Sequence, residues 1–143
     1  SGLGEEPGWR GYLLSNLQSR HPTRRAIWIV GAVWAVWHYP FTIYDTLTGM
    51  PETSVVQTLV TLLIALLGQT LSLIGITTIY AWIVNATKSV GLAILFHALS
   101  NFFPWLLLTG ASPALGVMTA VMPWIVVFVL EKIYGEERFP VSG

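Results

Sequence analysis

The sequence predicts an all-α fold, a polytopic membrane helix bundle with about four spanning helices and one short helix before them. Hydrophobic residues make up 54% of the 143 residues and charged residues only 10%, whereas soluble proteins carry about 25% charged residues. The stretches 59–67 and 124–130 contain no charge, and a soluble domain of this size has too little interior to bury them. In a bilayer, such segments must pair their backbone groups internally, which favours helices.

Composition also excludes several classes of function. The seven basic and seven acidic residues balance, so no basic face indicates a nucleic-acid partner. The absence of cysteine excludes disulfides and thiolate metal sites. The first residues are polar and acidic, which is not the pattern of a signal peptide. We therefore expect an integral membrane protein surrounded by the lipid bilayer, which in a prokaryotic host would be the plasma or inner membrane.

Hydrophobic runs separated by Gly, Pro and charged residues define the expected helices. These helices cover residues 7–18, 26–44, 55–84, 89–108 and 113–133. A span needs about 20 helical residues, and segments 26–44, 89–108 and 113–133 fit this length. Pro7 is expected to begin or kink the first helix, because proline suits a first turn but not a helix interior. Pro104 is expected to bend the fourth helix.

The segment 55–84 is too long for one upright span. It must tilt, protrude from the bilayer, or break near Gly68 or Gly75. Its Gly and Ser residues also suit close packing between helices. Gln69 is expected to hold neighbouring helices together rather than to form a site.

Basic residues are distributed unevenly over the connecting segments. Segment 19–25 contains three arginines and segment 85–88 one lysine, and Lys132 and Arg138 lie at the end of the last helix and beyond it. The loops that alternate with these segments contain no basic residue. By the positive-inside rule, 19–25, 85–88 and the C-terminus are cytoplasmic.

Polar side chains occur at membrane depth on the first, second and fourth predicted helices. They are Glu5, Glu6, Arg10, His38, His97 and Asn101. At about 1.5 Å per residue, Glu6, His38 and Asn101 lie roughly 20 Å from the cytoplasmic ends of their helices, and His97 about 13 Å. Ionisable groups at this depth are costly and are typically functional. The similar levels predict a buried site between helices.

Spacing assigns roles to the residues of the first two of these helices. Glu6 and Arg10 are i,i+4 with the acid first, the better order for an intrahelical ion pair. Glu5 then lies off that face and is expected to be unpaired. An apolar pocket raises the proton affinity of a carboxylate, which suits Glu5 to act as a general base. His38, one turn after Trp34, could hold a water against Glu5.

The fourth predicted helix contributes a pair of potential hydrogen-bond donors. His97 and Asn101 are also i,i+4 and therefore point to one side. Such donors could stabilise an oxyanion. Water activated by Glu and His, combined with an oxyanion donor pair, is what amide hydrolysis requires.

These residues resemble the motifs of a known family, the CPBP intramembrane proteases, which include CAAX prenyl endopeptidases and bacteriocin-processing or self-immunity (Abi-like) proteins. The stretch "EEPGWRGYLL" is similar to the EExxxR motif, and "WAVWH" is similar to FxxxH with Trp34 in place of Phe. "HALSN" matches HxxxN without departure. The motifs extend in the family's order from Glu5 to Asn101.

The resemblance implies an intramembrane endopeptidase that hydrolyses a peptide bond near the cytoplasmic leaflet. It implies that Glu5 and His38 activate the water, and that His97 and Asn101 stabilise the oxyanion. Glu6 and Arg10 then support a chamber that opens toward the cytoplasm. The substrate is expected to be a peptide or protein, lipidated or membrane-anchored. Because family members have further helices before the first motif, residues 1–143 are expected to be a protease core that lacks its N-terminal helices.

A zinc site is the alternative to metal-free catalysis. Glu5, His38 and His97 could bind zinc and leave a position for water. A closely spaced His-x-x-x-His pair is missing, however, and the ligands would come from separate helices. We therefore expect no metal and no other cofactor.

Other functions remain open at the level of sequence. Glu5, His38 and His97 could form the proton relay of a transporter, although transporters usually show internal repeats and none is evident. A catalytically silent immunity or scaffold protein could keep the same fold. Taken singly, an EExxxR string is usually a solvated helix face, and a His–Asn pair often joins membrane helices. The charges at 136–138 are interpreted as a solvated tail.

Overall fold

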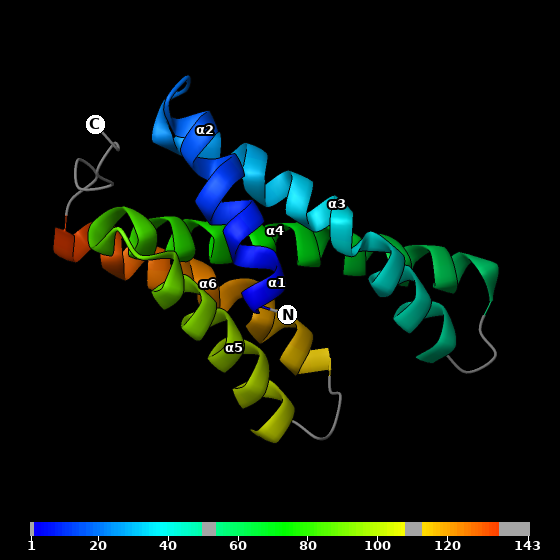
Figure 1. The fold of residues 1–143 in the computed structure, drawn as a ribbon. Coiled ribbons are helices and arrows are strands. Elements are labelled where there is room, and N and C mark those ends of the chain that lie inside the picture. The colour runs from blue at the N-terminus through cyan, green and yellow to red at the C-terminus, as the bar shows by residue number, and fades with distance from the viewer. Residues whose placement is uncertain (1, 50–53, 108–112, 135–143) are drawn as a thin grey trace.

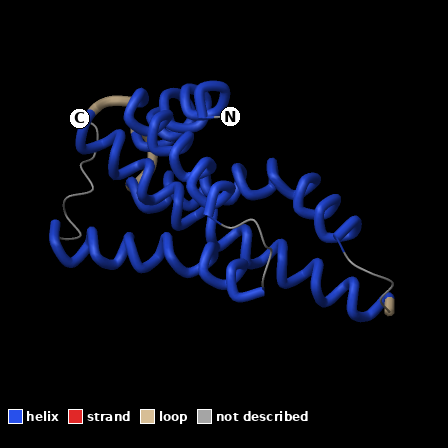
Figure 2. The backbone as a smooth tube through the Cα atoms, turned by 90° about the horizontal axis from the view of Figure 1, so that it is seen from below, coloured by secondary structure: helices blue, strands red, loops and turns tan. Residues whose placement is uncertain are grey.

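The computed structural model describes residues 2–49, 54–107 and 113–134, with side chains from 103 to 116 outside the description. Within these ranges the chain is helical apart from short connections and contains no strand (Figure 2). The predicted all-α class is therefore confirmed.

The N-terminal rod combines three helical stretches in series. They are α1 (Gly2–Glu6), the π-helix η1 (Pro7–Leu14) and α2 (Ser15–Gln18). The sequence predicts that the first helix begins or kinks at Pro7. A beginning at Pro7 is wrong, because helix is present from Gly2 onward. Pro7 instead marks the change to π-helix. Proline lacks the backbone N–H of an α-helical turn and its ring crowds the turn before it, so the regular α-helical hydrogen bonding is interrupted at this position.

The next two helices are longer than the sequence predicts. α3 covers Thr23–Gly49, so Asp45, expected in a loop, is helical. α4 covers Val55–Thr87 without interruption, which overturns a break near Gly68 or Gly75. At about 1.5 Å per residue α4 is roughly 50 Å long, more than the ~30 Å hydrocarbon core, so it must tilt or protrude.

Caps explain where α4 begins and ends. Ser54 Oγ accepts a hydrogen bond from the Gln57 backbone N–H at 3.3 Å, which is an N-cap contact. At the other end Lys88 adopts a left-handed conformation with φ 56°, and its N–H donates to Val84 O at 2.7 Å. A left-handed residue at this position ends the helix.

The last two helices are α5 (Val90–Leu107) and α6 (Pro113–Tyr134). α5 continues as helix past Pro104. Three helices in the described ranges are long and apolar enough to cross a membrane: Thr23–Gly49, Val55–Thr87 and Val117–Tyr134. The described apolar part of α5, Val90–Phe102, is shorter, so its role as a fourth span stays a prediction.

α4 is the central helix of the bundle. α3 packs along it, α6 packs against it, and the N-terminal rod contacts both α3 and α5 (Figure 1). A Cβ on Gly31 of α3 would lie 2.9 Å from Ile74 Cα, and a Cβ on Gly75 would lie 2.9 Å from Pro123 Cβ of α6. Small residues thus let these helices approach closely. The predicted packing role is confirmed for Gly75 but not for Gly68, which has no neighbour within 4 Å.

Polar and apolar residues are distributed as expected for a protein in lipid. α4 exposes a series of large apolar side chains, namely Leu59, Val60, Leu63, Ile64 and Leu67. In contrast, Glu6, Arg10 and Thr77 are fully buried. Charged groups inside and apolar groups outside are typical of membrane bundles. Gln69 hydrogen-bonds Thr42 of α3, in agreement with a role between helices.

Candidate active site

The buried centre of the site is a carboxylate with two partners. Arg10 Nη1 donates to Glu6 Oε1 at 2.9 Å, and His97 Nδ1 donates to the same oxygen at 2.7 Å. The predicted Glu6–Arg10 ion pair is therefore confirmed, and the π-helical segment does not prevent it. The contact of Glu6 with His97 was not predicted.

A glycine brings these two elements together. A Cβ on Gly2 of α1 would lie 2.9 Å from Ile94 O and 3.2 Å from His97 Cβ. Only a residue without a side chain fits against α5 at this distance. The close approach of α1 and α5 therefore places Glu6 within reach of the His97 ring.

The Arg10 guanidinium lies in an aromatic and hydroxyl environment. It lies over the Trp34 ring at 4.2 Å and over the Tyr80 ring at 4.5 Å, which are cation–π contacts. Its Nη2 donates to Thr77 Oγ1 at 3.2 Å. Among the described residues, Arg10 Nε and Glu6 Oε2 are buried without a hydrogen-bond partner. The pair is thus held by α3 and α4 as well as by its own helix.

Glu5 has a partner that the sequence interpretation missed. Trp34 Nε1 donates to Glu5 Oε2 at 2.9 Å. The expectation that Glu5 is unpaired is therefore wrong. Spacing along one helix gives no information about a donor 29 residues further along the chain on another helix. Glu5 itself is partly exposed, unlike Glu6.

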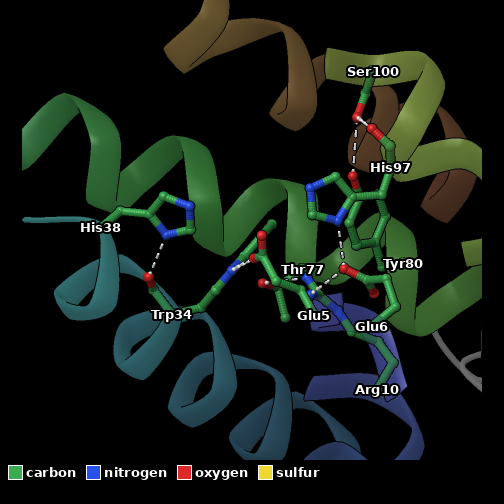
Figure 3. Close-up of polar contacts among 9 residues, drawn as sticks. All are labelled: Glu5, Glu6, Arg10, Trp34, His38, Thr77, Tyr80, His97 and Ser100. Carbon is green, nitrogen blue, oxygen red and sulfur yellow. Dashed lines mark hydrogen bonds and ion pairs between the residues drawn. The ribbon is translucent and has the colours of Figure 1, made fainter. Parts of the chain in front are cut away.

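His38 is oriented by the main chain of the same tryptophan. Its Nδ1–H donates to Trp34 O at 2.9 Å, which leaves Nε2 as an acceptor. The imidazole packs edge-on against the Trp34 ring, with 5.3 Å between ring centroids. His38 and Glu5 both contact Trp34, and the Glu5 carboxylate lies between the two histidines in the view of Figure 3.

The His97 side of the site contains further hydroxyl groups. Ser100 Oγ donates to His97 O at 2.9 Å and lies 3.0 Å from Tyr80 Oη. The Trp34 and Tyr80 rings each lie 5.7 Å from the His97 ring. Asn101 lies on the next turn of α5, and its side chain is exposed. Five of the six predicted residues, Glu5, Glu6, Arg10, His38 and His97, are thus joined directly or through Trp34.

A pocket opens beside Glu5. It has a volume of about 290 Å³ and is lined by Gly4, Glu5, Gly8, Trp9, Leu13 and Trp37. Added Cβ atoms on Gly4 and Gly8 would meet nothing within 4 Å. Trp9 and Trp37 meet edge to face with 6.5 Å between centroids. Glu5 therefore accepts a hydrogen bond from Trp34 through one carboxylate oxygen and also lines an open pocket.

The described residues do not form a metal site. No group of three or more His, Cys, Asp or Glu side chains in these ranges is arranged to hold a metal ion. His38 Nδ1 and His97 Nδ1 already donate to Trp34 O and to Glu6. These hydrogen bonds leave Nε2 of each ring for another ligand, as in histidines that bind zinc, so metal-free catalysis stays a prediction.

Some functional contacts come from residues that the motifs did not include. Thr77 and Tyr80 lie on α4 and Ser100 on α5, and each contacts a motif residue or its backbone. A signal was present for Thr77 and Tyr80, since they are polar residues one turn apart in a highly apolar helix. The charges at 136–138 lie outside the described residues.

Comparison with known proteins gives one family match and a partial relative. The model of the family described as type II CAAX prenyl endopeptidase Rce1-like matches residues 1–103, which include every predicted site residue. The CAAX prenyl protease 2 of Methanococcus maripaludis is 47% identical over 36 residues. That segment covers 25% of this chain and only 13% of the relative. No solved structure matches the chain.

Proposed function

This chain belongs to the Rce1-like family of type II CAAX prenyl endopeptidases, and from this premise we propose that it is an intramembrane endopeptidase that uses Glu5 as its base. The observation that carries the proposal is the position of Glu5. Its carboxylate lies at a pocket and is held by Trp34, directly beside the buried group of Glu6, Arg10 and His97.

In the proposed reaction, a water molecule enters beside Glu5 and transfers a proton to its carboxylate. His38 orients this water through Nε2, because its Nδ1–H is bound to Trp34 O. The resulting hydroxide attacks the carbonyl carbon of the scissile peptide bond. Glu5 then returns the proton to the leaving nitrogen as the bond breaks. General acid–base catalysis of this kind typically contributes about 10²- to 10⁴-fold.

His97 stabilises the oxyanion in this proposal. Since its Nδ1–H donates to Glu6, donation from Nε2 requires a ring that carries both protons. The Glu6 carboxylate is the counter-ion of such a ring. Asn101 is proposed to supply the second donor from the next turn of α5, as the family motif implies.

The test is cleavage by the full-length protein in lipid nanodiscs. The substrate is a fluorogenic peptide with a prenylated CAAX end, since the family is described by that substrate. An unprenylated peptide of the same sequence shows whether the lipid is needed. We expect Glu5→Gln and His97→Ala each to lower kcat at least about 100-fold. Undiminished cleavage by both variants would falsify the assignment.

The matched control is Glu131→Gln on α6. Glu131 forms a 3.4 Å ion pair with Arg24, whose side chain is 71% exposed. The substitution makes the same chemical change as Glu5→Gln, and we expect wild-type cleavage. If the wild-type protein cleaves neither peptide any faster than Glu5→Gln does, a catalytically silent family member is indicated instead.

A further inference from the structure

Trp34 is the one position where the motifs of this chain depart from the family pattern, and besides its ring packing the structure gives it three polar or charged contacts in the site. The indole N–H donates to Glu5 Oε2 at 2.9 Å. The ring face lies under the Arg10 guanidinium at 4.2 Å. The backbone carbonyl accepts the His38 Nδ1–H at 2.9 Å.

These three contacts do not depend on the indole equally. A phenylalanine at this position would keep the backbone carbonyl that binds His38 and a ring face for Arg10. It would have no N–H for Glu5. The departure from FxxxH therefore adds one specific interaction, a charge-assisted hydrogen bond to the proposed base.

We propose that Trp34 is a positioning residue that holds the Glu5 carboxylate in its reactive orientation through the indole N–H. The inference rests on the proposed function of Glu5. A carboxylate fixed through one oxygen presents the other to the water in the adjacent pocket. Trp34 can fix it firmly because its own side chain is only 2% exposed and packs against Tyr80 and His97.

Without this bond the Glu5 side chain can rotate about its dihedral angles, and only part of its population faces the water. Held groups react faster because their orientation is set before the chemical step. The loss therefore lowers kcat and has little effect on substrate binding. We expect a decrease of about tenfold to hundredfold for a hydrogen bond to a charged group.

The kinetic test compares Trp34→Phe with Trp28→Phe. Both substitutions remove one indole N–H from α3, but Trp28 is half exposed and packs against Trp124, away from Glu5. For Trp34→Phe we expect kcat to fall with KM close to wild type, in a protein that stays folded at the assay temperature although the smaller buried ring lowers its melting temperature. For Trp28→Phe we expect no change in kcat. A wild-type kcat in Trp34→Phe overturns the proposal. A fall in kcat that is no larger than the fall in the folded fraction at the assay temperature also overturns it.

A spectroscopic test detects the hydrogen bond without substrate. The chain has seven tryptophans, so ¹⁵N-labelled indoles give a small set of N–H signals. The Trp34 signal is the one missing from Trp34→Phe. We expect Glu5→Ala to move it strongly upfield and Glu5→Gln to move it less, because the amide oxygen still accepts a hydrogen bond. The Trp28 signal is the internal reference and should not move.

The two experiments separate failure of the inference from failure of the proposed function. An active protease whose Trp34 signal ignores Glu5→Ala overturns the positioning role and leaves the assignment of Glu5 intact. A protein whose Trp34 signal responds, but which cleaves no peptide in any variant, overturns the proposed function and with it the catalytic purpose of the hydrogen bond.

Discussion

Glu6 and His97 are separated by 91 positions in the sequence, and their side chains meet in the protein at 2.7 Å. This contact joins the N-terminal rod to α5 and makes Glu6 the shared acceptor of Arg10 and His97. Glu6 is also fully buried. Glu6 therefore belongs to the packed interior of the bundle, whereas Glu5 is partly exposed beside a pocket.

The first prediction concerns the buried Glu6–Arg10 pair. Arg10→Met keeps much of the side-chain volume but leaves the Glu6 carboxylate buried with one partner fewer. Removing one member of a buried ion pair typically costs about 3–5 kcal/mol, because the remaining charge is uncompensated. We expect a decrease of that size in the free energy of unfolding, measured by denaturant titration in detergent micelles.

The control for this prediction is the ion pair of Arg24 and Glu131. Its 3.4 Å contact is largely exposed, and exposed pairs contribute about 0–1 kcal/mol. We expect Arg24→Met to change the unfolding free energy by no more than that. Equal effects of Arg10→Met and Arg24→Met would show that the buried group does not hold the rod in place.

The second prediction compares two glycines of α4. A Cβ at Gly75 would lie 2.9 Å from Pro123 Cβ and 3.2 Å from Trp124 Nε1, whereas a Cβ at Gly68 would meet nothing within 4 Å. Gly75→Ala should force α4 and α6 apart at a cost of about 1–3 kcal/mol. Gly68→Ala should be neutral or stabilising by up to about 1 kcal/mol, because alanine is the better helix former.

Thermal unfolding of the two variants, measured side by side, decides this point. A higher melting temperature for Gly75→Ala than for Gly68→Ala would contradict the close approach of α4 to α6. Both substitutions add one methyl group to the same helix, so their difference reports the contact and not the helix propensity.

The third prediction concerns access to Glu5. Gly8 lines the pocket beside Glu5, and a side chain added there meets no neighbour. Gly8→Leu therefore fits the fold but fills space that the substrate needs in the proposed function. We expect KM for the peptide to rise, with the melting temperature unchanged. Gly68→Leu, which adds the same side chain far from the pocket, should leave KM as it is.

Much of the fold was predictable because lipid imposes a simple pattern. The apolar runs predicted each long helix to within a few residues, since a charge-free stretch has no other stable form in a bilayer. The predicted start of the third helix at residue 55 is confirmed, and Ser54 caps it. The helical residues before Pro7 were not predicted. Proline is common at the first position of a helix, so Pro7 was interpreted as a start or a kink.

The site was predictable where a contact is local and was missed where it joins separate helices. Spacing alone predicted the pair of Glu6 and Arg10, which lie one turn apart. It could not predict the contact of Trp34 with Glu5 or of Thr77 with Arg10, because the relative rotation of helices is set by packing. Glycines allow α1, α3 and α6 to approach their neighbours closely. Because a glycine has no side chain, the sequence does not indicate which helix packs against it.

The last prediction concerns metal dependence. No group of three metal-binding side chains is present in the described ranges, and the Nδ1 atoms of His38 and His97 are engaged in hydrogen bonds. A zinc ion held by Glu5, His38 and His97 would need these three side chains to converge on one point, which they do not do among the described residues. We expect dialysis against 1,10-phenanthroline to leave the cleavage rate of the full-length protein unchanged, with zinc well below one equivalent by elemental analysis. Loss of activity that returns on adding zinc, but not calcium, would show that the site rearranges around a metal.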